Sequence, residues 1–133
     1  MSARLFSCRL LMFLILATSL SLAAPVVSYA GGALDGKVFT AVIDGENDLL
    51  TFDNGTFNSS ACDAWGFGTG AYTTTAEMDG TMFEATVFSD KNGKMVWTGI
   101  VKGDEITGSY VWTKEGWFST KTKTEKFSGS LNP

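Results

Sequence analysis

The sequence predicts an all-β fold, a single eight-stranded antiparallel up-and-down meander closed into a barrel. Runs rich in threonine, valine and aromatic residues alternate with turn signals about ten residues apart, a spacing typical of sandwiches and barrels. No stretch repeats apolar residues at helical spacing. The chain has 133 residues and 15 glycines, and every glycine lies beyond residue 30, among these runs. A meander with a sharp bend in the middle favours a closed barrel over an open sheet.

The first 30 residues have the pattern of a cleaved signal peptide, which leaves residues 31–133 for the β-barrel domain. Arg4 and Arg9 precede an apolar run of 13 residues, and small residues follow up to Ala30. The apolar run is shorter than the roughly 20 residues that a membrane-spanning helix needs. Cleavage after Ala30 is the expected site, and cleavage after either alanine before Pro25 is the alternative. We therefore expect an exported protein, either periplasmic or secreted.

Turn signals divide the rest of the chain into eight strands. The first tight turn is Asn54–Gly55, which suits a type I′ hairpin because both central residues need positive φ. It pairs Phe52 with Phe57. The expected strands are Lys37–Asp44, Leu49–Asp53, Thr56–Ser60, Ala71–Met78, Thr81–Ser89, Lys94–Lys102, Glu105–Thr113 and Lys123–Asn132.

Two further connections set the register of the middle strands. Asp79–Gly80 is expected to form a two-residue turn that pairs Tyr72 with Val87. A three-residue loop at Lys91–Gly93 then pairs Val87 with Trp97. Consecutive strands thereby share one inward face, which consists of Tyr72, Thr74, Ala76, Phe83, Ala85, Val87, Met95, Trp97, Val101, Ile106, Tyr110 and Trp112.

The hairpin around Gly103–Asp104 contains an unusual pair of glycines. Its register places Gly99 opposite Gly108 in the middle of the hairpin. Glycine weakens a strand unless the sheet bends or another group packs closely there. Ala85 is expected beside Gly99, so a row of small residues crosses three strands. Such a row suits the strong coiling of a closed barrel.

Composition excludes several classes of function. The domain has eight lysines, fourteen acidic residues and no arginine, and therefore a formal charge of −6. This acid excess disfavours binding to nucleic acid or, after signal cleavage, to an anionic membrane. The chain has no histidine, which excludes Ser-His-Asp and Cys-His catalysis and histidine-containing zinc sites. We predict a protein that is not an enzyme and that has no cofactor and no metal.

Two small features have competing interpretations. Cys62 is the only cysteine after the leader, so the domain has no internal disulfide. Its thiol is either buried and inert or free to react, and the neighbouring carboxylate of Asp63 disfavours a reactive thiolate. The acidic stretch Asp44–Asp48 lacks the length of a calcium-binding loop and is interpreted as a solvated turn.

The chain resembles the small calycin-like barrels, the broad group that contains lipocalins and avidins. The resemblance rests on the eight sequential strands, on the early segment Gly36–Phe39, and on the hairpin from Trp97 to Tyr110. It implies a ligand site in the lumen or at the mouth. The segment Phe57–Gly68 also resembles part of small exported bacterial proteins of unknown function, which implies export.

The irregular stretch Ala61–Gly70 is the first candidate site, because functional residues gather on loops held by a rigid scaffold. Its aromatic residues Trp65 and Phe67 either plug one end of the barrel or form a lid over a ligand. The second candidate is the interior, where large aromatics would either fill the core or stack on a flat apolar ligand. These residues are Tyr72, Trp97, Tyr110 and Trp112.

The region before the last strand leaves two questions open. Alternation back from Phe127 places Glu125 and Lys123 on the inward face. Either the strand begins at a polar barrel mouth, or a bulge resets its register. Trp117 and Phe118 are expected in the preceding turn, buried over one end of the barrel by default, although exposure would make them a partner-binding patch.

These observations favour a non-catalytic, lipocalin-like barrel that binds a small apolar or aromatic molecule in its lumen or under the 61–70 loop. The alternative is an exported protein-interaction module, such as a hydrolase inhibitor that presents a rigid aromatic loop to a protein partner. An empty lumen of roughly 300 Å³ or more would favour the first hypothesis. A filled barrel with exposed aromatics would favour the second.

Overall fold

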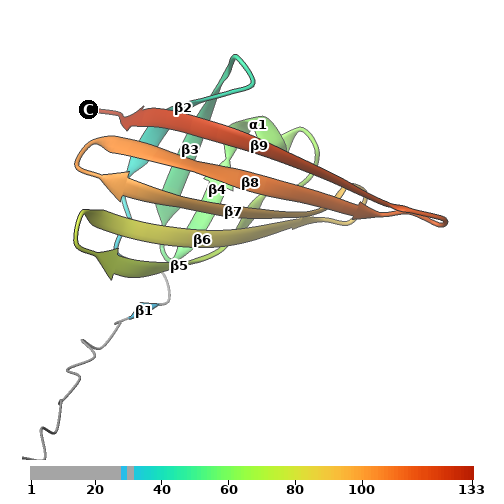
Figure 1. The fold of residues 1–133 in the computed structure, drawn as a ribbon, viewed down its shortest axis with the longest axis horizontal. Coiled ribbons are helices and arrows are strands. Elements are labelled where there is room, and N and C mark those ends of the chain that lie inside the picture. Colours follow the sequence, from blue (N-terminus) through green and yellow to red (C-terminus); the bar gives the residue numbers. More distant parts are fainter. Residues whose placement is uncertain (1–27, 30–31) are drawn as a thin grey trace, which may run out of the picture.

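Eight antiparallel strands follow one another around a closed barrel (Figure 1). The computed structural model describes residues 28–29 and 32–133. Each strand pairs with the next along the chain, and the last pairs with the first, which confirms the predicted meander and its closure. The strands are β2 (Val38–Ile43), β3 (Glu46–Asp53), β4 (Thr56–Ser59), β5 (Thr69–Glu77), β6 (Gly80–Ser89), β7 (Gly93–Lys102), β8 (Glu105–Glu115) and β9 (Thr120–Leu131).

Two short elements add to the barrel. The strand β1 (Ser28–Tyr29) pairs with β5 opposite Thr75 and Thr74. The helix α1 (Ser60–Asp63) follows β4 directly, within a segment expected to be strand and then irregular loop. The expected signal peptide lies outside the described residues, apart from the two residues of β1. In the part of the chain that the structure describes, no helix is long and apolar enough to cross a membrane.

The turns that need positive φ form where the sequence places them. Asn54 and Gly55 have φ of 47° and 72°, and Phe52 pairs with Phe57 as predicted. Gly103 has φ of 57°, and the hairpin that it joins has the predicted register throughout. In both cases the backbone conformation of the turn determines which residues can face each other.

The β5–β6 turn differs from the prediction by one residue. Glu77 pairs with Gly80, so the turn consists of Met78 and Asp79, and Gly80 belongs to β6. A side chain at Gly80 would collide with the carbonyl oxygen of Val101 on the next strand. This glycine is therefore required for close approach between strands, and the prediction mistook it for a turn residue.

The β6–β7 loop has the predicted length of three residues, but it lies one residue earlier. Ser89 pairs with Gly93, and the loop is Asp90–Asn92. Trp97 consequently faces Ala85 instead of Val87. Both errors displace the pairing by two residues, and the side-chain period of a strand is two. The predicted inward face is therefore confirmed, except that Ala76, near the end of β5, is exposed.

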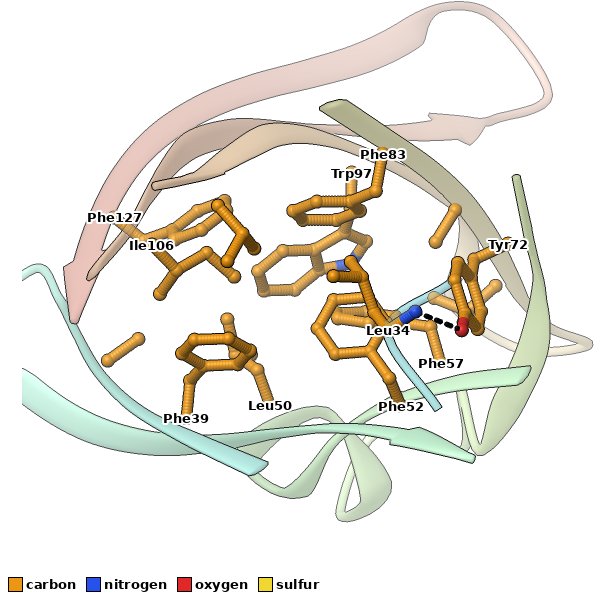
Figure 2. Close-up of a cluster of buried hydrophobic side chains, with 14 of the residues drawn as sticks. Leu34, Phe39, Leu50, Phe52, Phe57, Tyr72, Phe83, Trp97, Ile106 and Phe127 are labelled. Atoms are coloured by element: carbon orange, nitrogen blue, oxygen red, sulfur yellow. Dashed lines mark hydrogen bonds between the residues drawn. The ribbon is translucent and has the colours of Figure 1, made fainter. Parts of the chain in front are cut away.

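Aromatic rings fill the half of the barrel nearest the β3–β4, β5–β6 and β7–β8 turns, which we call the lower half. Figure 2 shows these rings pointing toward one another from opposite walls. Phe52 is fully buried, and its ring lies 5.0 Å from those of Tyr72 and Phe83, measured between centroids. Phe57 lies 5.1 Å from Trp97 by the same measure. Ring-to-ring contacts therefore occupy this half of the lumen.

The glycine pair in the β7–β8 hairpin makes space for this packing. Gly99 lies opposite Phe83, not beside Ala85 as predicted. A Cβ on Gly99 would lie 2.8 Å from the Phe83 ring, and one on Gly108 would lie 2.7 Å from the Phe127 ring. The two glycines therefore allow the Phe83 and Phe127 rings to pack directly against the inner face of the sheet, which explains why glycine occurs in mid-strand.

A hydrogen-bonded cluster seals the lower end. The Tyr72 hydroxyl donates to Asp35 Oδ1 at 2.6 Å and accepts the Leu34 amide at 3.2 Å, the second of which is drawn in Figure 2. Asp35 Oδ1 also accepts the Gly55 amide at 3.0 Å. Burial and this carboxylate raise the pKa of Tyr72 to about 12. The Tyr72 hydrogen bond is the main cause that lowers the pKa of Asp35.

Candidate functional site

The opposite end of the barrel holds a pocket of about 570 Å³. The β2–β3 and β6–β7 turns, the loop that contains α1 and the outer parts of β8 and β9 surround it. Buried Trp97 and Phe67 lie at its inner end, and Met95, Tyr110 and Trp112 form an apolar wall. Charged residues of the β2–β3 and β8–β9 hairpins form its rim. The pocket therefore combines an aromatic interior with a charged entrance.

Five of the six predicted site residues line this pocket, namely Trp65, Phe67, Trp97, Tyr110 and Trp112. Tyr72 does not line it, because it belongs to the sealed end described above. The sequence places Tyr72 on the same inward face as Trp97, Tyr110 and Trp112. It does not distinguish the filled half of the lumen from the open half, since both are lined by aromatics.

The two aromatics of the 61–70 loop have different positions. Phe67 is only 5% exposed and packs into the hydrophobic core. Trp65 is 64% exposed and lies at the pocket edge. Phe67 therefore plugs the barrel, as one interpretation proposed. Trp65 is an exposed side chain at the mouth.

Hydrogen bonds hold this loop against the neighbouring turn. The carbonyl oxygen of Trp65 accepts from Ser89 Oγ at 2.8 Å and from Asn92 Nδ2 at 2.7 Å. The Trp112 indole N–H in turn donates to the Asn92 carbonyl oxygen at 2.7 Å. These hydrogen bonds thus connect the loop, the β6–β7 turn and the pocket wall.

Asp48 anchors the beginning of α1. It is buried, and its carboxylate accepts from the Ser59 hydroxyl, from Ser60 Oγ at 3.0 Å and from the Ala61 amide at 2.9 Å. The expectation of a solvated turn is wrong for this residue, because β3 already begins at Glu46. Alternation back from buried Leu50 would have placed Asp48 inward, and this was the available signal.

Cys62 lines the pocket as an unactivated thiol. It is half-buried, and its Sγ lies 3.6 Å from Met95 Sδ. Burial is the main cause that raises its pKa, and the carboxylates of Asp48 and Asp63 raise it further. The neutral thiol is therefore favoured, and the site provides no thiolate nucleophile.

The rim of the pocket has a polar wall built by β8 and β9. Their pairing is continuous from Glu105 to Glu115, without a bulge. Inward positions at the outer end of β9 therefore carry charge, as the polar-mouth alternative proposed. Lys123 Nζ lies 2.9 Å from Glu125 Oε1. Burial raises the pKa of Tyr110, which keeps its hydroxyl neutral beside these charges.

The same continuous pairing carries the β8–β9 turn away from the barrel (Figure 1). Trp117 and Phe118 are 93% and 95% exposed at its tip. The expectation that they cover one end of the barrel is wrong. The uninterrupted pairing of β8 with β9, up to Glu115 and Thr120, extends the tip past the mouth instead.

The charged residues of the pocket are lysines on β8 and β9 and acids on the β2–β3 hairpin, with the Cys62 thiol beside them. Among residues 28–29 and 32–133, no group of three His, Cys, Asp or Glu residues could hold a metal ion. The acids that line the pocket, Asp44, Glu46 and Asp48, all belong to the β2–β3 hairpin. The buried carboxylate of Asp48 is occupied by three donors. Comparisons with protein-family models, curated proteins and solved structures found no match to this chain.

Proposed function

We propose that this chain is an exported, non-catalytic barrel of calycin-like kinship that binds a small apolar or aromatic molecule at its mouth. The observation that carries the proposal is the aromatic pocket of about 570 Å³ above a filled core. Ligand pockets in proteins have volumes of roughly 300–1,000 Å³ and mostly apolar walls. The apolar leader pattern in the sequence supports export.

The pocket walls suit a flat ligand. Tyr110 packs on Trp97 with ring centroids 4.7 Å apart, and Trp112 continues the same wall toward the rim. Such rings prefer offset or tilted stacking, which a planar ligand can join. The hydrogen bonds between Trp112, Asn92 and Trp65 reduce the conformational entropy that binding has to remove.

The direct test uses the neutral fluorophore N-phenyl-1-naphthylamine and the protein purified from its own host. We expect saturable probe fluorescence and quenching of tryptophan emission. Trp112→Leu should weaken binding several-fold, because it removes one ring from the wall. The control Phe88→Leu alters a residue that is exposed on the outside of the barrel, and should bind as the wild type does. Unsaturable or absent binding by the wild type would refute the proposal.

The exposed hairpin tip favours a second candidate function, a protein-interaction module. Trp117 and Phe118 together present two almost fully exposed large aromatics on a projecting turn. Monomeric proteins rarely leave such a patch without a role. If the tip inhibits a hydrolase, the wild type should lower hydrolase activity in an extract of the host's export compartment. The double variant Trp117→Ser/Phe118→Ser should not, while its pocket still binds the neutral probe.

A further inference from the structure

The inward face of the β8–β9 hairpin changes from apolar and aromatic residues near the core to charged residues at the rim. Its cross-strand pairs are, in outward order, Gly108 with Phe127, Tyr110 with Glu125, Trp112 with Lys123, and Lys114 with Lys121. The outer three pairs line the pocket, except for Glu125. A ligand lying along this wall would meet aromatic rings at its inner end and ammonium groups at its outer end.

The outermost pair has an unfavourable arrangement that a ligand could relieve. Lys114 and Lys121 lie directly opposite each other on antiparallel strands, where like charges repel. Lys114 is half-buried, although it is charged. In the part of the chain that the structure describes, the only ion pair joins Lys123 to Glu125. The two outer lysines therefore have no carboxylate partner there.

The acids at the mouth do not neutralise these lysines. Asp48 is engaged by its three donors at the start of α1. Asp44 and Glu46 are exposed and lie on the β2–β3 hairpin, another part of the rim. Asp44 forms the turn there with φ of 51°. Charge at the mouth is thus divided. Two lysines without an ion-pair partner lie at the outer ends of β8 and β9, and solvated anions lie on the β2–β3 hairpin.

We propose that the ligand of this pocket is an amphipathic anion. Its apolar or aromatic body lies against Trp97, Tyr110 and Trp112, and its carboxylate, sulfonate or phosphate group pairs with Lys114 and Lys121. This inference rests on the proposed function, which it deepens by naming the ligand class. It adds the two lysines as the residues that orient the ligand and select its charge.

The test compares two probes that share one ring system. N-phenyl-1-naphthylamine is neutral, and 1-anilinonaphthalene-8-sulfonate adds a sulfonate. We expect the wild type to bind the sulfonate about tenfold more tightly, the effect of two partly exposed ion pairs. Added sodium chloride should reduce this preference, because salt screens exposed charges. The affinity for the neutral probe should not depend on salt.

The variant Lys114→Gln/Lys121→Gln should lose the preference for the sulfonate and bind the neutral probe as the wild type does. The matched control Lys102→Gln/Lys126→Gln removes the same charge from two exposed lysines that do not line the pocket, and should keep the preference. The variant Trp117→Ser/Phe118→Ser should also keep it, which excludes probe binding at the hairpin tip.

Each outcome separates the inference from the function on which it rests. Equal affinities of the wild type for the two probes, or a preference that persists in Lys114→Gln/Lys121→Gln, would overturn the anion inference and leave the pocket as a binding site. Tighter binding of the neutral probe would also overturn it, because the acids would then dominate the rim. If neither probe binds the wild type, the proposed function itself fails.

Discussion

The two ends of the barrel use similar residues for opposite purposes. At the lower end, the Tyr72 hydroxyl has both a donor and an acceptor partner, and rings from all sides meet in the lumen. At the upper end, Tyr110 and Trp112 line one side of an open space. The difference teaches that aromatic content does not distinguish a core from a pocket. What distinguishes them is whether the facing wall supplies a second layer of side chains.

The largest expected effect on stability comes from truncating an aromatic ring in the filled half of the barrel. Phe52 packs against four other rings, those of Phe39, Phe57, Tyr72 and Phe83. Phe52→Ala should reduce the free energy of unfolding by about 3–5 kcal/mol, measured by urea denaturation. Trp112→Ala in the open half should cost much less, because Trp112 is only partly buried.

The comparison fails if the two substitutions cost the same. If Phe52→Ala does not fold, the comparison can be made with leucine variants, because Phe52→Leu keeps most of the side-chain volume. Phe52→Leu should then destabilise the protein more than Trp112→Leu does.

Releasing the loop from the barrel should have an intermediate effect confined to the open end. Asp48→Asn replaces an acceptor that holds three donors, at a cost of about 1–3 kcal/mol in unfolding free energy. Cys62 should then react faster with iodoacetamide, because α1 loses its anchor. Asp53→Asn changes an exposed carboxylate on the same strand and serves as the control. An unchanged alkylation rate in Asp48→Asn would show that the loop does not depend on this anchor.

The hydrogen-bonded cluster at the lower end should make the free energy of unfolding depend on pH. Because folding raises the pKa of Tyr72 to about 12, its neutral form is favoured in the folded state. Its contribution to stability is complete below the unfolded pKa of about 10 and is lost as pH rises from there to about 12. Urea unfolding at pH 8 and pH 11.5 should detect this loss.

In Tyr72→Phe this part of the alkaline loss should be absent, and stability at pH 8 should already be lower by about 1–2 kcal/mol, since the Leu34 amide loses its acceptor. An identical alkaline loss in wild type and variant would mean that Tyr72 is not the group responsible. Burial also raises the pKa of Tyr110, so Tyr110→Phe measures the part of the alkaline loss that comes from the open end.

Local signals predicted the barrel, and long-range contacts decided its details. The strands, the closure and the inward face follow from turn chemistry and from a side-chain period of two. The register of β5 with β6 was predicted wrongly because a glycine after aspartate is typical of a turn. Gly80 instead leaves space for the carbonyl oxygen of Val101 on the next strand. Five of the six candidate site residues line the pocket, but α1 and its anchor Asp48 were missed. A four-residue helix is too short to leave a periodic pattern.

By itself, the sequence determined the class of fold, the registers at Asn54 and Gly103, and the inward face of the four middle strands. These depend on backbone φ at single residues and on strict alternation, which are local properties. Only the tertiary structure decided where the filled core ends and the pocket begins, which glycines admit a neighbouring strand, and that Lys114 faces Lys121 at the rim. These depend on residues distant in the chain, whose separation is set when the barrel closes.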